Sequence, residues 1–300
     1  MYKQALVGAL ASMLLEGGYR TVECRGSRSS FDLIARKDDR IFLVKVLSNI
    51  EALSRERAQE LKNISSLLGG YPVVVSENMK NHMLSDGVVY DRYDVSVMNP
   101  STFSLLINEG SPQAYSKRGS YCVEIDKDLL SRARKKLGYT QDDLAHEMGV
   151  SKQSIYRYEN SGSVSIEVFE KMVEVLGENL LRTDFRLSQM PAEQQTIGLH
   201  LTPLKKLVDE RFRNMGFKTT ITNAPFDMVA AKGDRIFSVV SNDWRRLSEK
   251  LSVLEEMSSV LDGYTVCISE RRVKSSVSVL NPDELSEIRS AREFFKRLSK

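Results

Sequence analysis

One feature limits the fold of this 300-residue chain more than any other: a stretch of its sequence occurs twice. The first occurrence begins at Gly18 and the second at Gly216. In each, a helical pattern ends at the glycine, an extended stretch follows, and Phe-Asp precedes a polar turn and Asp-Arg-Ile-Phe. The matching motifs are Phe31-Asp32 and Phe226-Asp227, then Asp39–Phe42 and Asp234–Phe237.

The similarity continues downstream through a helical pattern of about 20 residues. Both occurrences then contain Gly-Tyr, an apolar strand that ends in Ser-Glu, and a closing Val-Ser-Val-(Met/Leu)-Asn-Pro. Chance similarity does not hold register through so many elements, so we interpret the repetition as an internal duplication. The matching segments are Gly70-Tyr71 and Gly263-Tyr264, Ser76-Glu77 and Ser269-Glu270, Val95–Pro100 and Val277–Pro282.

Each half of the duplication predicts a small α/β domain with the order helix, strand, turn, strand, helix, strand and a further strand. The apolar runs PVVVSE and TVCISE are typical of short strands buried on both faces. The first half has extra residues around His82–Tyr93, for which we expect a hairpin or a loop.

Between the halves lies a helical region bounded by two polar connections. Ser111–Ser120 and Arg182–Gln195 are polar and turn-rich, which favours linkers. The predicted fold class is therefore α/β plus all-α, with two duplicated α/β domains flanking a helical domain. The expected domains are residues 1–110, 121–181 and 197–300.

The helical region shows the start and stop signals of several short helices. Leu129, Leu130, Ala133 and Leu137 share one face of a first helix, which is expected to end at Gly138. Thr140 is a good N-cap for a second helix, with Asp142 and Asp143 in its first turn. Gly149 supplies a left-handed turn residue, Val150 fills the gap between helices, and Ser151 caps a third helix that buries Ile155. Ala145 lets the second and third helices cross closely.

The run TQDDLAHEMGVSKQSIYRYE, Thr140–Glu159, resembles the helix-turn-helix of the lambda-repressor and Cro family. The resemblance covers about 50 residues and implies that the third helix, residues 151–159, lies in the major groove of DNA. It implies base contacts by Lys152, Gln153 and Arg157, with Ser154 and Tyr156 nearby. It further implies phosphate contacts by Gln141 at the start of the second helix. The DNA-binding residues expected are Thr140, Gln141, Ser151, Lys152, Gln153, Ser154, Tyr156 and Arg157.

The same resemblance implies an ion pair between Arg134 and Glu159 that ties the first helix to the third. Two other interpretations remain open for this region. It could be a small helical bundle with a solvated basic face, or the same fold used to bind protein.

The α/β halves resemble the restriction-endonuclease-like fold of Holliday junction resolvases. That family uses an aspartate and an acid-x-lysine motif on the next strand, and the two carboxylates hold a divalent metal. Asp32 and Lys45 match two of these positions, but Leu43 occupies the place of the second acid. In the second half Asp227 remains, and sequence alignment puts Ser238 and Val240 at the acid and lysine places. One carboxylate is a poor Mg²⁺ site, so we expect both sites to be degenerate and the chain not to be an enzyme.

A structural role for the two aspartates is the alternative that we favour. Each would cap a turn or pair with a nearby arginine, for instance Arg40 or Arg235. Lys45 lies on a strand that should be buried, so it either keeps a hydrogen bond at the former site or extends outward to solvent.

Composition excludes several other classes. The net charge of +3 neither supports nor opposes DNA binding, which needs only a local basic face. Cys24, Cys122 and Cys267 lack paired ligand spacing, which favours reduced thiols in the cytoplasm over disulfides or zinc. The apolar run Ala5–Leu15 is expected to be a core helix rather than a signal sequence, and no stretch approaches the ~20 apolar residues of a membrane span. No metal site and no cofactor are expected, and His82, His146 and His200 are isolated.

The whole arrangement is similar to a family of archaeal helix-turn-helix transcriptional regulators. We therefore expect a cytoplasmic, sequence-specific regulator that binds double-stranded DNA as a homodimer, since one such module contacts only a half-site. The α/β halves would then serve assembly or sensing. The effector, the operator and the choice between repression and activation are not readable. A structure-selective DNA nuclease, or an antitoxin or protein scaffold, are the alternatives.

Overall fold

A computed structural model of the chain describes residues 2–24, 29–80, 82–112, 114–117, 120–177, 180, 187, 202–222, 225–241, 244–271 and 276–298. The chain divides into two compact units. Unit 1 combines Met1–Lys80 with Ser188–Lys300, and unit 2 is Asn81–Leu187. The second connection predicted from the sequence, Arg182–Gln195, lies outside the described residues apart from Leu187. The domain boundaries predicted near residues 110 and 121 remain predictions.

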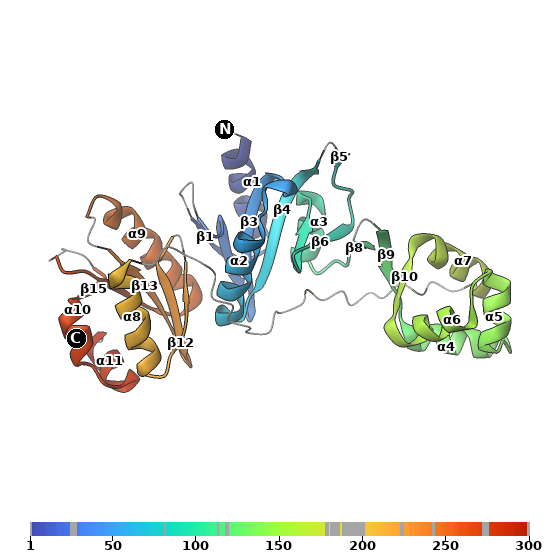
Figure 1. The fold of residues 1–300 in the computed structure, drawn as a ribbon. Helices are drawn as coiled ribbons and strands as arrows, with labels where there is room; N and C mark the ends of the chain where they lie inside the picture. The colour runs from blue at the N-terminus through green and yellow to red at the C-terminus, as the bar shows by residue number, and fades with distance from the viewer. Residues whose placement is uncertain are drawn as a thin grey trace. The chain divides into compact units, whose positions relative to one another are not determined.

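The N-terminal segment of unit 1 contributes four neighbouring strands of a sheet and two long helices (Figure 1). Strands β1 and β2 and strands β2 and β3 pair antiparallel, whereas β3 and β4 pair parallel. The apolar N-terminal run forms a core helix, as predicted, and buries Leu10 and Leu14 completely. The elements are α1 (Tyr2–Glu16), β1 (Arg20–Glu23), β2 (Leu33–Lys37), β3 (Arg40–Asn49), the short 3-10 helix η1 (Ile50–Ala52), α2 (Arg55–Leu68) and β4 (Tyr71–Met79).

The C-terminal segment of unit 1 repeats this order of helices and strands, without a described counterpart of the 3-10 helix, and adds a fifth strand and two final helices. Its sheet runs β11-β12-β13-β14-β15, with two antiparallel pairings followed by two parallel ones. The elements are α8 (Pro203–Asn214), β11 (Lys218–Ile221), β12 (Met228–Lys232), β13 (Asp234–Val240), α9 (Trp244–Leu261), β14 (Tyr264–Ile268), β15 (Ser278–Leu280), α10 (Pro282–Glu287) and α11 (Ala291–Leu298).

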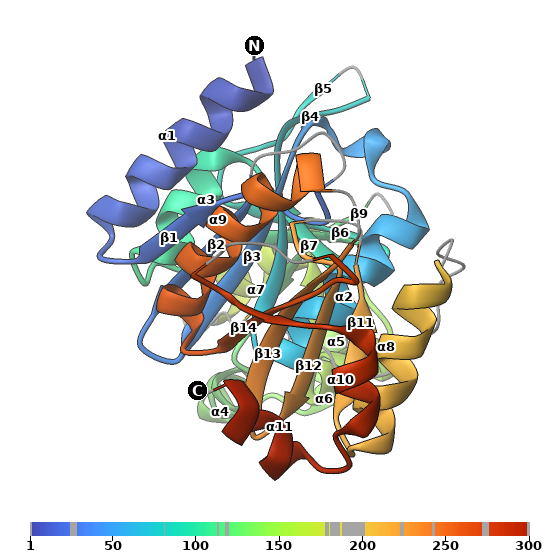
Figure 2. The same cartoon turned by 90° about the vertical axis from the view of Figure 1, so that its left-hand side faces the viewer.

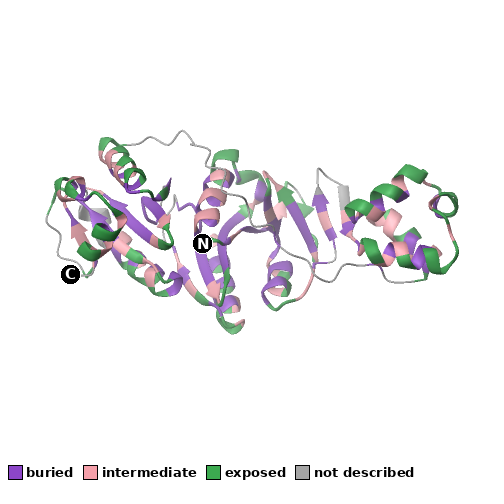
Figure 3. Ribbon diagram, turned by 90° about the horizontal axis from the view of Figure 1, so that it is seen from below, coloured by how far each residue is buried: buried purple, intermediate pink, exposed green. Residues whose placement is uncertain are grey.

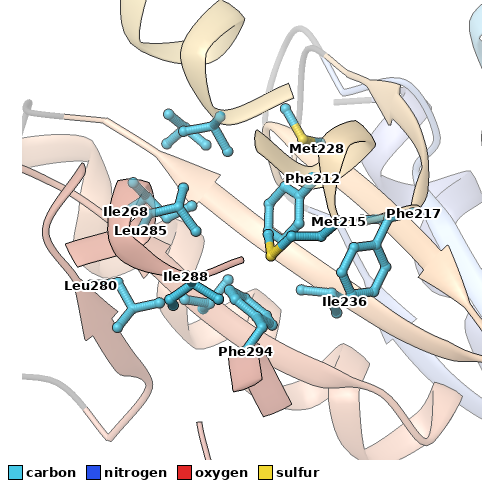
Figure 4. Close-up of a cluster of buried hydrophobic side chains, with 14 residues drawn as sticks. Phe212, Met215, Phe217, Met228, Ile236, Ile268, Leu280, Leu285, Ile288 and Phe294 are labelled. Carbon is cyan, nitrogen blue, oxygen red and sulfur yellow. The ribbon is translucent and has the colours of Figure 1, made fainter. Parts of the chain in front are cut away.

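Helices α8, α10 and α11 lie beside the second sheet (Figure 2), and their apolar side chains form a buried cluster with those of the strands (Figure 4). The rings of Phe212 on α8 and Phe294 on α11 meet edge to face with centroids 5.2 Å apart. Ile236 on β13 and Ile268 on β14 belong to the same buried cluster. Most residues of the strands are buried and the helices keep exposed outer faces, which is the pattern of helices packed on a sheet (Figure 3).

A difference of one turn residue shifts the register of β13 relative to β3. Two residues, Asp38 and Asp39, separate the paired residues Lys37 and Arg40, whereas Gly233 alone separates Lys232 from Asp234. The two Asp-Arg-Ile-Phe motifs therefore occupy different places on their sheets, and their side chains point to opposite faces.

The glycines that open β4 and β14 confirm this shift. A Cβ at Gly70 would meet Leu43 and the Ile41 carbonyl, and one at Gly263 would meet Phe237 and the Arg235 carbonyl. Leu43 is thus equivalent to Phe237. The sequence alignment that placed Ser238 and Val240 at the acid and lysine positions is wrong by one residue, because Phe237 and Val239 lie there.

The N-terminal and C-terminal segments of unit 1 pack against each other reciprocally. Helix α2 contacts β11 and β12, while α9 contacts β1 and β2. The matching residues Phe31 and Phe226 meet with ring centroids 5.9 Å apart, and both are fully buried. Arg235 donates to the carbonyls of Leu261 and Leu68, which end the two long helices, at 3.1 and 2.9 Å. Such reciprocity is the arrangement of an isologous dimer within one chain.

Unit 2 contributes five neighbouring strands of a sheet, followed by a helical region. The strands lie in the order β7-β6-β8-β9-β10, and among these described strands β6 and β8 pair parallel while the others pair antiparallel. The elements are β5 (His82–Met83), β6 (Val88–Arg92), β7 (Val95–Met98), α3 (Pro100–Ile107), β8 (Ala114–Lys117), β9 (Ser120–Glu124), α4 (Lys127–Lys136), α5 (Gln141–Met148), α6 (Lys152–Ser161), β10 (Ser163–Ser165) and α7 (Ile166–Leu176).

Two predictions for unit 2 have different outcomes. The extra residues form the predicted hairpin, since β6 and β7 pair across Tyr93 and Asp94, which both have positive φ. The linker predicted over Ser111–Ser120 is wrong over β8. There the chain pairs with β6 on one side and β9 on the other, and buries Ala114 and Ser116. The polar composition of this segment gave no sign of a strand. Its backbone N–H and C=O groups are hydrogen-bonded to the neighbouring strands β6 and β9.

Candidate nucleic-acid interface

Local capping builds the helix-turn-helix of unit 2. Thr140 caps α5 in a capping box with Asp143, and its side chain accepts from the Asp143 N–H. Gly149 ends α5 at φ 64, a left-handed conformation that glycine adopts without strain. Ser151 caps α6 by accepting from the Ser154 N–H. The predicted signals for α5 and α6 are confirmed.

A small apolar core holds these helices together. Leu130, Ala145 and Ile155 are buried, and Val150 packs against the same cluster. The sequence prediction that Leu137 faces this core is wrong, because its side chain is 49% exposed. Leu137 lies past the last residue of α4, at its C-cap, where the helical periodicity used for the prediction no longer holds.

Helix α6 presents a polar surface to solvent. Lys152, Gln153, Tyr156 and Arg157 are exposed, and Tyr156 has 61% of its surface accessible. Ser154 is half-buried, and Ile155 and Tyr158 fix the opposite face of the helix in the core. The Arg157 guanidinium lies over the Tyr158 ring, 5.2 Å from its centroid. Five of the eight predicted DNA-binding residues, counting the exposed cap Ser151, thus share one accessible end and side of α6.

The half-buried carboxylate of Glu159 ties α6 to α4 and α5. Arg134 Nε donates to Glu159 Oε1 at 2.7 Å, which agrees with the ion pair that the resemblance implied. Gln141 Nε2 donates to Glu159 Oε2 at 2.6 Å. Burial raises the pKa of Glu159, but the hydrogen bonds from Arg134 and Gln141 and the Arg134 charge outweigh it, so the pKa lies below its usual value.

The start of α5 is already occupied by side chains of the chain itself. Asp143 Oδ2 accepts from the backbone N–H of Thr140 at 2.8 Å and from its hydroxyl at 2.6 Å. These two bonds lower the pKa of Asp143. Thr140 and Gln141, both predicted to bind DNA, therefore also have structural partners within the chain.

In unit 1, Asp32 is a buried carboxylate with two ammonium partners. Its Oδ1 accepts from Lys3 Nζ at 2.8 Å and from Lys45 Nζ at 3.5 Å, and its Oδ2 accepts from the Val46 N–H at 2.7 Å. Lys45 also donates to the Ser29 carbonyl. Burial lowers the pKa of Lys45, and the Asp32 charge opposes that effect. Lys45 thus keeps a hydrogen bond at the former site, one of the two outcomes expected.

Asp227 has the same arrangement in the C-terminal segment. Its Oδ2 accepts from the Val240 N–H at 3.0 Å. Lys250 Nζ lies 2.9 Å and Lys205 Nζ lies 2.7 Å from Oδ1. The prediction that Arg40 and Arg235 pair with the two aspartates is wrong. Arg235 donates hydrogen bonds to carbonyls at the ends of two helices. Lysines, not arginines, pair with the carboxylates of Asp32 and Asp227.

The described residues contain no set of three or more His, Cys, Asp or Glu side chains placed to hold a metal ion. Leu43 is fully buried where an acid-x-lysine motif would put its acid, and Phe237 is fully buried at the equivalent place. None of the helices described is long and apolar enough to cross a bilayer.

Sequence reasoning did not identify three residues of these sites: Lys3, Lys205 and Lys250. Lys3 and Lys205 lie on the helices that precede each sheet, far along the chain from the aspartates. Nothing in the local pattern marks them, because their role depends on how α1, α8 and α9 cross the strands.

Two regions of the chain match described families. Residues 3–113 match the PD-(D/E)XK superfamily domain, and residues 130–181 match a helix-turn-helix. No solved structure matches the chain.

Several archaeal proteins are similar over nearly the whole length, and three of them share the name "Putative HTH-type transcriptional regulatory protein". The protein of Methanocaldococcus jannaschii is 31% identical, covering 90% of this chain and 89% of its own length. That of Archaeoglobus fulgidus is 30% identical, covering 98% and 97%. That of Pyrococcus horikoshii is 31% identical, covering 99% and 97%.

Proposed function

The chain belongs to this archaeal family of HTH-type transcriptional regulatory proteins, and from that premise we propose that it is a cytoplasmic, sequence-specific regulator of transcription that reads DNA with α6. The observation that carries the proposal is the exposed polar surface of α6. Its side chains are free to approach base edges while Ile155 and Tyr158 anchor the helix.

Individual roles follow from the chemistry of each side chain. Gln153 suits adenine, through two hydrogen bonds, and Arg157 or Lys152 suits guanine. Ser151, Ser154 and Tyr156 lie beside them on α6. Gln141 contacts phosphate from the start of α5, next to the cap Thr140, and its bond to Glu159 holds the side chain in place for the contact.

The α/β segments support this function without cleaving DNA. We propose that they arose by duplication, flank the helix-turn-helix domain, and serve assembly or sensing. Their reciprocal packing within unit 1 supports an assembly role. A buried leucine or phenylalanine in place of the second acid supports the absence of metal-dependent cleavage. Branched DNA incubated with Mg²⁺ or Mn²⁺ should remain intact, and specific nicking would instead favour a nuclease.

The whole protein is a homodimer on its operator. One helix-turn-helix contacts one half-site, so two chains are needed for useful affinity. Because each α/β segment already pairs within the chain, the second chain uses a different surface. Sedimentation of the protein with and without operator DNA tests the stoichiometry, and a monomer on DNA contradicts it.

The decisive experiment is selection of bound duplexes from a random pool, followed by variants of the reading surface. Arg157→Ala should cost about 1–3 kcal/mol of operator binding and relax one base position. Arg132, an exposed arginine on α4, is the matched control, and Arg132→Ala should leave the selected sequence unchanged.

Gln141→Ala separates positioning from base reading. It should weaken binding about equally on all sequences, because phosphate contacts carry no sequence information. A variant of Arg157 that behaves like the Gln141 variant shows that α6 is not the reading helix. If no sequence is enriched, a role in protein binding is favoured.

A further inference from the structure

Each α/β segment carries two ammonium groups on one buried carboxylate. On Asp32 they come from Lys3 and Lys45, and on Asp227 from Lys205 and Lys250. Two ammonium groups against one carboxylate leave each site with net positive charge. Three of the four lysine side chains are partly accessible, at 42% for Lys3 and about 20% for Lys205 and Lys250, so solvent and its solutes reach their charge, whereas Lys45 is buried.

The lysines of the two sites do not occupy equivalent positions. When the ends of α1 and α8 are superposed through their glycines, Gly18 and Gly216, Lys205 falls four residues after the position of Lys3, which is one helical turn. Lys45 lies on strand β3, whereas Lys250 lies on helix α9.

The first segment places a further cation at the position equivalent to Lys250. Counting back from the helix ends, Leu68 and Leu261, this position is Arg57, and its side chain is exposed. Both long helices thus bring a positive group to the same place. The lysines that contact the two aspartates nevertheless come from different positions, and in both segments two ammonium groups lie against the one carboxylate.

The ammonium groups occupy carboxylate oxygens that would otherwise be free to bind a divalent cation. A lysine ammonium group is part of the protein, so its presence does not depend on free Mg²⁺. Like a bound metal ion, it attracts phosphate. Since Phe31 and Phe226 directly precede the two aspartates and contact each other, the two sites flank the contact between the segments.

We propose that the Asp32 and Asp227 sites are metal-independent docking sites for the phosphodiester backbone of duplex DNA. They bind DNA without reading its sequence and without cutting it. This activity is separate from α6, so it persists if α6 does not read DNA.

The test uses the full chain with Lys152→Ala and Arg157→Ala, so that the contribution of α6 is reduced. Binding to a random-sequence duplex is measured over a range of salt concentrations in the presence of EDTA. Lys3→Gln combined with Lys205→Gln should weaken binding and flatten the dependence of log K on log salt by about 0.9 for each phosphate that the protein no longer neutralises.

The matched control is Lys206→Gln, which removes an exposed lysine adjacent to Lys205 on α8. It should change the salt slope less than Lys205→Gln alone. Lys205→Arg keeps the charge and should bind like the parent, and this variant decides the matter if the glutamine variants fold poorly. An unchanged slope in the double variant, or binding that EDTA abolishes, overturns the proposal.

A variant of opposite sign completes the test. Asp227→Asn removes the negative charge and leaves an acceptor for the Val240 N–H, so its lysines face DNA unneutralised. DNA binding should then become tighter and more salt-dependent. If the lysines served only to neutralise a buried aspartate, this change would not tighten DNA binding, and that outcome contradicts a docking role.

Discussion

The two α/β segments of unit 1 keep the same buried carboxylate but surround it with lysines from different positions. Asp32 and Asp227 both accept a backbone N–H at Oδ2 and both carry two lysines. One lysine of each pair lies on the helix before the sheet, but the other lies on strand β3 in the first segment and on helix α9 in the second. Strand β13 is also shifted by one residue relative to β3. Burying a carboxylate requires compensating charge, whereas the source of that charge is free to change. The charge balance around a buried carboxylate is therefore a better guide to which residues surround it than a sequence motif is.

The largest effect is expected at the contact between the segments. Phe31→Ala and Phe226→Ala should each lower the free energy of unfolding by about 3–5 kcal/mol, because both rings are fully buried. Since the two rings touch, the loss of unfolding free energy in the double variant should differ from the sum of the losses in the two single variants. Denaturant titration measures the cycle.

Phe294 provides the matched control for that cycle. It is equally buried, but it belongs to the cluster of α8, α10 and α11. Phe31→Ala combined with Phe294→Ala should be additive. Additivity between Phe31 and Phe226 would instead mean that the two segments do not share a core.

The next effect distinguishes the two carboxylate sites. Lys45→Met should cost about 3 kcal/mol, because Lys45 is 7% exposed and its loss leaves Asp32 with one ammonium partner. Lys250→Met should cost about 1 kcal/mol, since Lys250 is 22% exposed and water screens its charge. Urea denaturation compares them, with Lys206→Met as the control that should change little. If the two variants lost equal free energy of unfolding, Lys45 on its strand and Lys250 on its helix would stabilise the protein equally, which contradicts the prediction.

A carboxylate outside these segments tests whether the same principle holds in unit 2. The folded-state pKa of Glu159 lies below its usual value of 4.5, so its contribution is present above that pH and is lost as pH falls through the lower folded-state pKa. Glu159→Gln should cost about 1–2 kcal/mol at neutral pH. The difference from wild type should shrink in acid, as thermal melts across pH will show. A difference that is independent of pH contradicts a charged Glu159.

The smallest effect concerns metal. Mg²⁺ or Mn²⁺ should not raise the melting temperature of the wild-type protein, because lysines occupy both carboxylates and ligand-linked stabilisation needs a binding site. Leu43→Glu places an acid beside Lys45, and this variant should be less stable without metal and gain stability with Mn²⁺. A metal-dependent shift in the wild type would mean that the lysines are displaced.

The sequence predicted local structure well and long-range geometry poorly. Thr140, Gly149 and Ser151 act as expected, because a cap depends on its own few neighbours. The order of helices and strands in both α/β segments was readable from periodicity except at one point. The single strand expected between the first helix and the turn is two strands, β1 and β2 in one segment and β11 and β12 in the other.

Interactions between distant elements explain what was missed. The register of β13 depends on one turn residue at Gly233, and the repeated Asp-Arg-Ile-Phe motif concealed it. The lysines on α1, α8 and α9 reach the aspartates only through the packing of helices on the sheet. Strand β8 was hidden because its partner β6 lies outside the polar run.

The pairing of β9 with β10 affects how the DNA-reading part could be transplanted between relatives. Strand β10 lies between α6 and α7, yet it is hydrogen-bonded to β9, which precedes α4, and Tyr115 on β8 bonds the Ser163 hydroxyl. A chimera cut at the helix boundaries would sever this ladder. An exchange of residues 114–177 would keep the hydrogen bonds between β9 and β10 and between Tyr115 and Ser163. These strands therefore set the smallest segment that can be exchanged.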